Sequence, residues 1–522
     1  MATRLHTLAF IQVNLYQDSV ALMRVAQRVL ALPEVVNATL QMGNPANKEI
    51  LQEAGLLTAE VRGAGASDIM VVVQANTLAA AEAAQALCRT QLAGQDHAST
   101  ATESTQAVPA RCLAMGMRSV NGSGTDSAIN LVQISVPGAY AAAEALKALK
   151  LGLNVFLFSD NVPLAQELVI KQEATRRGLL VMGPDCGTAI VGGVPLGFAN
   201  VVRRGTIGLV AASGTGSQEV TTQIHRMGGG VSHAIGTGGR DVYEQIGGAT
   251  MLQGIALLAR DAATQVIAIV SKPPAPAVMR KVLAAVQAAG KPAVLVFIGG
   301  KVQLSAAQQR HIVLAATLVD CAAAAVKLAR IEPAPAQIYP LPSVPTFARS
   351  QRYLRALYSG GTYAAEAQVL WSLQGLKVWS NVPLVDALAL PDARRASREH
   401  TALDLGDDAF TVGRPHPMID QAARIERFRA EAADASVRVI LLDVVIGWGA
   451  HADPASELAP VIAQAISDAA RAGRALAVIG FVCGTVDDSQ GLAAQEATLQ
   501  RAGMVLAGNS ANAAWLAAMW LR

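Results

Sequence analysis

Aromatic residues and charged residues are both scarce in this chain. Its 522 residues are 4% aromatic and 16% charged, and the net charge at pH 7 is only +3. So small a positive excess, with no basic stripe interleaved with aromatic residues, argues against nucleic acid as a partner. The low aromatic content beside 52% hydrophobic residues favours helix-rich α/β layers over an all-β fold.

Cysteine is also rare. The five cysteines are dispersed and form no C-x-x-C pair: Cys88, Cys112, Cys186, Cys321 and Cys483. An odd, scattered set favours reduced thiols over a disulfide framework or a zinc site. We therefore expect no metal site.

Long apolar runs are missing as well. A long uncharged run, 186–202, is rich in Gly, Pro and Asn, which predicts strands and turns instead of a membrane span. The apolar stretch near the N-terminus is short and breaks at Gln12 and Asn14, unlike a signal peptide. These features predict a cytoplasmic protein with no membrane partner.

Alternating strand-like and helix-like patterns divide the chain into parts. Residues 127–204 follow the order βαβαβ, which predicts a doubly wound parallel sheet. Polar residues at its strand ends, Asn161, Asp185 and Cys186, lie where such sheets bind ligands. The full division is an N-terminal α/β domain (1–91), a linker (92–126), the doubly wound sheet (127–204), an α/β domain (205–330), a proline-rich linker (331–349) and a further α/β domain (350–522).

The region after the second linker repeats the preceding one in its order of elements. "YSGGTYAAEA" at 358–367 corresponds to "SGTGSQEV" at 213–220, and "RVILLDVVIGWG" at 438–449 corresponds to "QVIAIVSKPP" at 265–274. Recurrence of a whole unit indicates a duplicated architecture. We predict two flavodoxin-like α/β domains in tandem.

Each repeat has a small, glycine-rich turn between a strand and a helix. Such a turn exposes backbone N–H groups at the positive end of the helix dipole, which suits an anion. Neither turn carries the G-K-[ST] or G-x-G-x-x-G signature of a nucleotide site, so phosphate is favoured, with ordinary helix capping as the alternative. The predicted phosphate-binding residues are Ser213, Gly214, Thr215, Gly216, Gly360, Gly361 and Thr362.

Further candidates follow other strand-like runs in turns rich in Gly or Pro. We assign catalytic roles to Arg240, Arg414 and His416, and substrate-binding roles to Asn161, Asp185, Cys186, Gly238, Gly239 and Lys272. Arginine can bind phosphate or carboxylate bidentately, and a histidine fixed between two prolines can act in proton transfer or polarise a carbonyl. The alternatives are ion-paired loop cations, a structural histidine and a packed cysteine. The acidic stretch "DLGDD" at 404–408 is read as solvated, with a metal role less favoured.

Several segments resemble succinyl-CoA synthetase. "GTIGLVAASGTGSQEV" at 205–220 resembles the start of the ligase domain of the alpha subunit, and the segment ending in "VMGPDCGT" at 181–188 resembles its CoA-binding domain. The region after the proline-rich linker resembles the C-terminal domain of the beta subunit. In that superfamily two helix starts jointly hold a phosphate that is carried on a histidine. The resemblance implies that the two turns form one phosphate site.

The resemblance is closer to the FdrA family of acyl-CoA synthetase-like proteins. Motifs such as "MGNPANK", "FSDNVPL", "AIGTGGRD", "DLGDDAFTVGRPHPMID" and "LLDVVIGWGAHADP" are similar to that family over nearly the whole chain. This implies a subunit of an oxamate carbamoyltransferase, which splits oxalurate with phosphate into oxamate and carbamoyl phosphate in allantoin breakdown. The implied ligands are these small anions, the implied partners are other subunits, and no cofactor is required.

The sequence also departs from the synthetase. Where the synthetase has its phosphorylated histidine after the "VLVFIGG" strand, this chain reads "GGKVQLSAAQQRHIVLAAT", and His311 has no glycines around it. "SVNGSGTDSAINLVQISVPG" replaces the glycine-rich opening of the CoA domain, so CoA is kept only as an alternative ligand. Two other functions stay open: a component of an NDP-forming acyl-CoA ligase, and a non-catalytic scaffold subunit that binds small anions.

Overall fold

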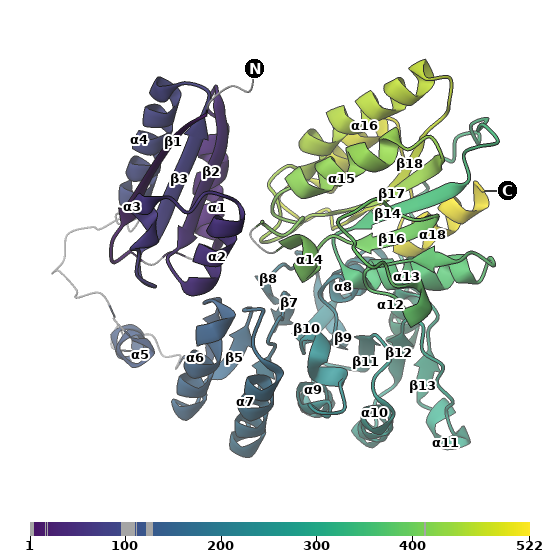
Figure 1. Cartoon of the computed structure of the whole chain (residues 1–522). Helices are drawn as coiled ribbons and strands as arrows, with labels where there is room; N and C mark the ends of the chain where they lie inside the picture. The colour runs from purple at the N-terminus through teal and green to yellow at the C-terminus, as the bar shows by residue number, and fades with distance from the viewer. Residues whose placement is uncertain are drawn as a thin grey trace. The chain divides into compact units, whose positions relative to one another are not determined.

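The computed structural model of the chain describes residues 5–15, 17, 19–94, 110, 112–121, 129–411 and 414–521 (Figure 1). These fall into two compact units. The N-terminal unit is Met1–Cys112 with Val412–Pro415, and the main unit is Leu113–Thr411 with His416–Arg522. None of the helices in the described part combines the length and apolar character needed to cross a membrane.

The N-terminal unit contains an antiparallel sheet of order β1-β3-β2. Side chains of the central strand β3 point alternately into two small hydrophobic cores. Ile69 and Val71 pack with α1 and α4, whereas Met70 and Val72 pack with α2 and α3. Because this strand is covered on both faces, residues 69–73 form a continuous apolar run. The elements are β1 (His6–Gln12), α1 (Ser19–Leu30), β2 (Val35–Met42), α2 (Pro45–Glu53), α3 (Ala59–Arg62), β3 (Ile69–Ala75) and α4 (Leu78–Gly94).

The main unit begins with a small parallel sheet of order β4-β5-β6. Its elements are α5 (Leu113–Asn121), β4 (Leu131–Ile134), α6 (Gly138–Lys150), β5 (Asn154–Leu157), α7 (Leu164–Arg177) and β6 (Val181–Met182). Apart from the end of α4, Ala110, Cys112 and α5, the linker expected over 92–126 lies outside the described residues. On α7, buried Lys171 forms ion pairs with Glu167 at 3.2 Å and with Asp241 of the next domain at 2.6 Å.

A seven-stranded sheet of order β13-β12-β11-β9-β10-β7-β8 forms the first flavodoxin-like domain. Strands β9 to β13 are parallel, and the antiparallel pair β7–β8 extends the sheet beside β10, so the boundary expected at 204 falls inside this sheet. The strands are β7 (Thr188–Val191), β8 (Val194–Gly197), β9 (Arg204–Ala211), β10 (Val231–Gly236), β11 (Val266–Ser271), β12 (Ala293–Phe297) and β13 (Ile312–Leu314). The helices are α8 (Gly214–Arg226), η2 (Gly239–Val242), α9 (Ala249–Arg260), α10 (Pro276–Ala289), α11 (Ala306–Gln309) and α12 (Leu318–Leu328).

The second flavodoxin-like domain has a six-stranded parallel sheet of order β15-β16-β14-β17-β18-β19. Without the short edge strand β15, its order equals that of β9 to β13, and this confirms the predicted α/β fold class. The strands are β14 (Tyr353–Tyr358), β15 (Val378–Trp379), β16 (His400–Asp404), β17 (Val437–Val445), β18 (Ala477–Cys483) and β19 (Met504–Leu506). The helices are α13 (Gly361–Ser372), η3 (Asp386–Leu388), α14 (Asp408–Thr411), α15 (Ala422–Ala433), α16 (Pro454–Arg471), α17 (Leu492–Arg501) and α18 (Ser510–Met519).

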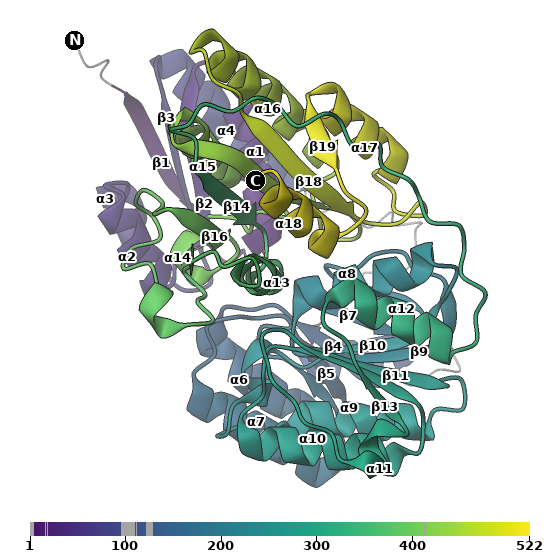
Figure 2. The same ribbon diagram turned by 90° about the vertical axis from the view of Figure 1, so that its right-hand side faces the viewer.

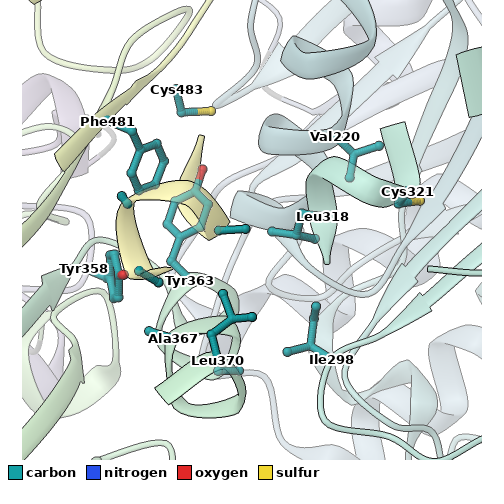
Figure 3. Close-up of a cluster of buried hydrophobic side chains, with 14 of the residues drawn as sticks. Val220, Ile298, Leu318, Cys321, Tyr358, Tyr363, Ala367, Leu370, Phe481 and Cys483 are labelled. Atoms are coloured by element: carbon teal, nitrogen blue, oxygen red, sulfur yellow. The ribbon is translucent and has the colours of Figure 1, made fainter. Parts of the chain in front are cut away.

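The two flavodoxin-like domains share one hydrophobic core. Helices α8 and α12 of the first domain face α13 and α18 of the second (Figure 2). Val220, Leu318, Tyr363, Leu370 and Phe481 lie in this core, and all are at most 3% exposed (Figure 3). Because burial of apolar surface is the main stabilising term in folding, the shared core holds the domains in one arrangement.

Two buried glutamates fix that arrangement with directional contacts. Glu219 of α8 and Glu366 of α13 each stand six residues after the N-cap of their helix. Glu219 Oε1 accepts a hydrogen bond from the Ser510 backbone N–H at the start of α18 (3.3 Å). Glu366 Oε1 accepts one from the Leu318 N–H at the start of α12 (2.8 Å). Each domain therefore caps the last helix of the other.

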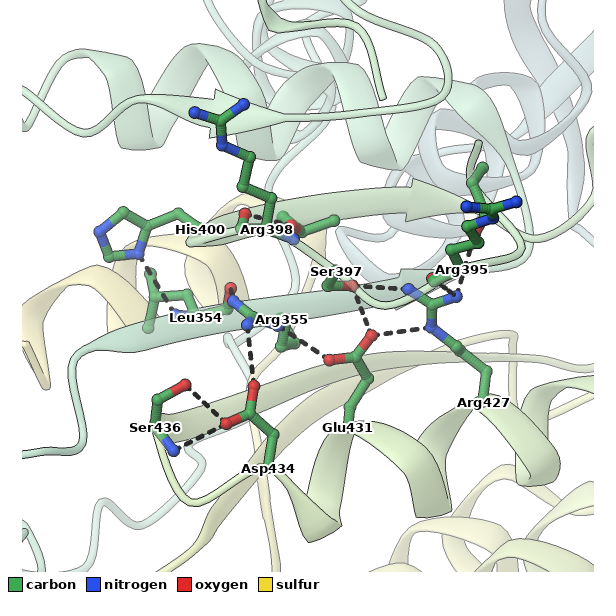
Figure 4. Close-up of polar contacts among 12 residues, drawn as sticks. Leu354, Arg355, Arg395, Ser397, Arg398, His400, Arg427, Glu431, Asp434 and Ser436 are labelled. Carbon is green, nitrogen blue, oxygen red and sulfur yellow. Dashed lines mark hydrogen bonds and ion pairs between the residues drawn. The ribbon is translucent and has the colours of Figure 1, made fainter. Parts of the chain in front are cut away.

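A buried polar network anchors the irregular stretch before β16 (Figure 4). Arg355 on β14, 2% exposed, donates from Nε to Glu431 Oε2 at 2.8 Å, and Arg427 donates from Nε to the other oxygen of Glu431 at 2.7 Å. Arg427 also donates to the carbonyls of Ala393 and Arg395, at 2.9 and 2.8 Å. These contacts tie α15 to β14 and to the segment that leads into β16.

The buried Glu366 predicts a specific dependence of stability on pH. Burial raises its pKa from 4.5 to about 7, so the folded protein binds a proton there that the unfolded chain has released. That stabilisation is complete below pH 4.5 and is lost as the pH rises through 7. Glu366→Gln keeps an acceptor for Leu318 N–H and cannot ionise. As the pH rises from 5 to 8, wild type loses this stabilisation and Glu366→Gln does not. We therefore expect the free energy of unfolding of the variant, measured with urea, to rise relative to that of wild type by up to about 3 kcal/mol. Equal losses in both proteins would contradict this prediction.

Candidate functional site

Two helices begin at the same place in the main unit. Ser213, the N-cap of α8, accepts a hydrogen bond from Gly216 N–H at 2.9 Å, and its Oγ lies 2.5 Å from Thr362 Oγ1 in the first turn of α13. A Cβ on Gly360 would stand 2.2 Å from Thr215 Cγ2, so a side chain there would prevent this close approach. We call residues 213–216 and 360–362 the cradle.

The position of the cradle follows from the two sheets. Helix α8 follows β9 and α13 follows β14, and in each sheet this strand stands where the strand order reverses. Open α/β sheets bind ligands at this point, outside the carboxyl ends of the strands. Gly214 is exposed and Ser213 and Gly361 are half-buried, whereas the remaining cradle residues are buried. The structure thus brings together all seven predicted phosphate-binding residues.

A lysine and a carboxyl group border the start of α13. A Cβ placed on Gly361 would lie 3.5 Å from Nζ of exposed Lys272 and 2.7 Å from Oδ2 of Asp404. Asp404 is 8% exposed, and its Oδ1 accepts from Gly406 N–H at 2.9 Å. Burial raises the pKa of Asp404 to about 7, and nearby Asp407 adds to this while Lys272 opposes it. Asp404 is therefore buried, contrary to the solvated acidic stretch expected there.

His416 lies beside Gly406, in the turn that follows Asp404. There it is a neutral hydrogen-bond donor. Its Nδ1 accepts from Met418 N–H at 3.2 Å, so the ring hydrogen is assigned to Nε2. A Cβ on Gly406 would stand 2.5 Å from that Nε2, and the ring packs against Phe198 with centroids 5.6 Å apart. Burial, helped by Arg424, lowers the pKa of His416 to about 4. The geometry therefore suits polarisation of a carbonyl better than proton transfer near neutral pH.

Arg240 is held by structural contacts. Its Nε lies 2.9 Å from buried Glu167 Oε2, and a terminal N–H donates to the Val162 carbonyl at 2.7 Å. This matches the alternative of an ion-paired loop cation more closely than a free anion-binding arginine. Gly238 has φ 78°, and a Cβ on it would stand 2.2 Å from the Pro184 carbonyl oxygen, so the turn at 238 needs glycine for close packing.

The other candidates around Arg240 stand at strand ends of the small parallel sheet. Asn161 and Asp185 follow β5 and β6 with φ values of 53° and 55°, and both are exposed, as is Gly239. Partial desolvation raises the pKa of Asp185 to about 7, and the nearby carboxylates Asp160 and Asp408 add to this. The structure thus groups Asn161, Asp185, Gly239 and Arg240 as a second cluster, with Asp408 nearby.

Of the other predicted site residues, Cys186 is packed in the core, and Arg414 groups with the N-terminal unit. Cys186 is 3% exposed, its Sγ donates to the Thr188 carbonyl at 3.5 Å, and burial raises its pKa to about 12. Such a thiol is a packed residue and not a nucleophile. Arg414 is exposed and belongs to the segment Val412–Pro415, which groups with the N-terminal unit. It is therefore not among the residues that the main unit brings together.

His311 stands at the wrong edge of its sheet for phosphate transfer at the cradle. It is exposed just before β13, and its carbonyl accepts from Ala293 N–H at the start of β12 (2.8 Å). The amino ends of parallel strands lie opposite the carboxyl ends, where α8 begins. Within the described ranges, no group of three or more His, Cys, Asp and Glu side chains is placed to hold a metal ion.

Sequence reasoning missed Asp404 as a site residue and the capping roles of Glu219 and Glu366. Asp404 ends β16, which pairs with the strand that leads into α13, and this position at the carboxyl edge was an available signal. Aligning the two repeats also places Glu219 and Glu366 at one position, but the helix starts that they cap are far away in sequence.

Three family models match the chain. The heavy metal-associated domain of AllF matches residues 5–109, the CoA binding domain matches 203–299, and the CoA-ligase model matches 357–520. The CoA-binding match thus falls on the first flavodoxin-like domain, whereas the resemblance expected such a domain over 127–204.

Whole proteins were compared as well. YahF of Escherichia coli K12 is 41% identical over 97% of each chain. The alpha subunit of succinate–CoA ligase from Methanothermobacter thermautotrophicus is 32% identical over 22% of this chain, and subunit SauD of the sulfoacetate-CoA ligase from Bilophila wadsworthia is 28% identical over 22%. These matches span 40% and 42% of those subunits.

Among solved structures, a dinucleotide-forming acetyl-coenzyme A synthetase from Ca. Korarchaeum cryptofilum covers 76% of this chain and 84% of its own, with 15% identity and a TM-score of 0.32. A likeness this low carries no argument about function. The similarity to YahF over nearly the full length, together with the CoA-binding and CoA-ligase models, shows that the chain belongs to the FdrA-like family of acyl-CoA synthetase-like proteins.

Proposed function

We propose that this chain is a subunit of an acyl-CoA ligase-type enzyme and that its cradle holds the phosphate of an acyl phosphate. The observation that carries the proposal is the meeting of two helix N-termini, with Ser213 Oγ and Thr362 Oγ1 2.5 Å apart and Lys272 alongside. Backbone N–H groups, helix dipoles and a lysine together suit a phosphate group. The CoA-ligase and CoA-binding matches support the same class of reaction.

The chemistry is acyl transfer from phosphate to the thiol of CoA. The sulfur forms a bond to the acyl carbon, the bond between that carbon and the phosphate oxygen breaks, and the thiol proton ends on the released phosphate. Donors in the cradle stabilise the negative charge that grows on the leaving phosphate. The Nε2–H of His416, beside Gly406, is suited to hydrogen-bond the acyl oxygen as its charge develops.

We propose other subunits as partners for this chain. SauD, which matches part of it, is by its description one subunit of an ADP-forming ligase. In the proposed enzyme the partner makes the acyl phosphate with a nucleotide, and this chain carries the acyl-transfer half of the reaction.

A second candidate is carbamoyl transfer between oxalurate and phosphate. It is favoured by the match to the AllF domain over residues 5–109 and by the position of His311 away from the cradle. In this reaction a phosphate oxygen attacks the carbamoyl carbon of oxalurate, the carbon–nitrogen bond breaks, and the nitrogen of the departing oxamate takes the proton. Carbamoyl phosphate is itself an acyl phosphate, so the cradle serves both reactions in the same way.

The proposed function predicts phosphate binding at the cradle. Phosphate and acetyl phosphate are expected to raise the melting temperature of the full chain, because a ligand at a hundredfold excess over Kd stabilises by about 2.7 kcal/mol. In Gly361→Ala the new Cβ enters the cradle beside Asp404 and Lys272, and we expect at least a tenfold weaker affinity.

The matched control is Gly63→Ala in the N-terminal unit, where a Cβ meets nothing within 4 Å. It is expected to bind phosphate as the wild type does. Equal affinity of all three proteins for phosphate would contradict the placement of the ligand at the cradle.

A further prediction separates the two candidate reactions by their acceptor. With phosphate at saturation, the acyl-CoA reaction predicts that CoA raises the melting temperature further and that oxamate does not. Carbamoyl transfer predicts the reverse. A thermal titration of the full chain with CoA and with oxamate measures both, and absence of any additional shift with CoA would count against the ligase-type function.

A further inference from the structure

We propose that Asp404 carries the proton that lets phosphate bind in the cradle: its neutral carboxyl donates a hydrogen bond to the phosphate, and its ionised form excludes it. The inference rests on the proposed phosphate site and adds a residue and a proton to it. It predicts that one proton is bound with each phosphate under conditions where Asp404 is ionised in the free protein.

The geometry of Asp404 carries the argument. The side chain is more than nine-tenths buried, and Oδ1 is held by Gly406 N–H at 2.9 Å. Oδ2 accepts no hydrogen bond from the described residues, and it lies 2.7 Å from the point where a Cβ on Gly361 would stand. One oxygen is thus fixed, and the other is aimed at the start of α13 without a partner.

An ionised Asp404 and a phosphate compete for the same place. The first turn of α13 attracts a single negative group through its free N–H groups and its dipole. When Asp404 is ionised its own Oδ2 supplies that negative charge, and a phosphate would meet a carboxylate across a short gap. When Asp404 is protonated, the O–H becomes a donor to a phosphate oxygen.

Charged neighbours of Asp404 come from several elements. Lys272, after β11, favours the ionised form, whereas Asp407 before α14 and Asp443 on β17 oppose it. Asp443 is itself paired with Arg424 of α15, at 3.1 Å. His416 lies beside Gly406, and with its pKa lowered to about 4 it does not change charge above pH 6.

The protonation of Asp404 changes within the range in which proteins are assayed. Burial raises its pKa to about 7, so the neutral form predominates below that pH and the carboxylate above it. Affinity for an anion in the cradle therefore falls as the pH rises, by about tenfold for each unit well above the pKa.

The experiment measures sulfate affinity of the full chain from pH 6 to pH 9 by thermal shift and calorimetry. Sulfate is the probe because it stays a dianion over this range, so a change in affinity reports on the protein. Wild type is expected to lose affinity about tenfold per unit at the alkaline end. Asp404→Asn keeps a donor and cannot ionise, so its affinity should be independent of Asp404 titration and higher than that of wild type at pH 9.

The matched control is Asp407→Asn, which removes a neighbouring carboxylate and should keep the fall in affinity with pH. Binding by wild type that does not change with pH, or an equal fall in Asp404→Asn, would overturn the inference and leave the phosphate site standing. Failure of sulfate and phosphate to bind any of the three proteins at any pH would instead overturn the proposed function.

Discussion

The reciprocal capping of α18 by Glu219 and of α12 by Glu366 is the constraint on which the arrangement of the two flavodoxin-like domains depends. Hydrophobic burial alone is not directional, and the shared core would tolerate small shifts between domains. A buried carboxyl that must reach one particular backbone N–H does not, because a shift would leave both groups unsatisfied at a cost of about 1–3 kcal/mol each. The two glutamates thus fix how the two domains are positioned across their apolar interface.

The cradle is a consequence of that fixed arrangement of the two domains. With α8 and α13 held side by side, their first turns approach until Ser213 and Thr362 share a hydrogen bond and Gly360 leaves room for Thr215. Two positive helix ends aimed at one place repel each other unless a negative group lies between them. Asp404 lies at the start of α13, where its ionised form places a negative charge that comes from within the chain.

The sequence predicted what depends on local patterns. The two tandem domains and the seven cradle residues followed from hydrophobic periodicity and from strand–turn–helix junctions, which are local. What it could not predict depends on contacts distant in sequence. Arg240 follows a glycine turn like an anion-binding arginine, but Glu167, more than seventy residues earlier, pairs with it. From the sequence, Asp404 looks like part of a solvated acidic loop. In the fold it ends β16, which pairs with β14, and it is buried there.

In both candidate reactions the phosphate is held in the same way, so the acceptor has to be selected elsewhere. The second cluster, with Asn161 and Asp185, belongs to the small parallel sheet, which the buried Lys171–Asp241 ion pair ties to the first flavodoxin-like domain. Removing one member of such a pair costs about 3–5 kcal/mol, so this sheet is a firm part of the main unit. From its edge an aromatic row runs through Phe158 and Phe198 to His416. This row links the end of β5 with His416, whose Nε2 lies beside Gly406 next to the buried Asp404.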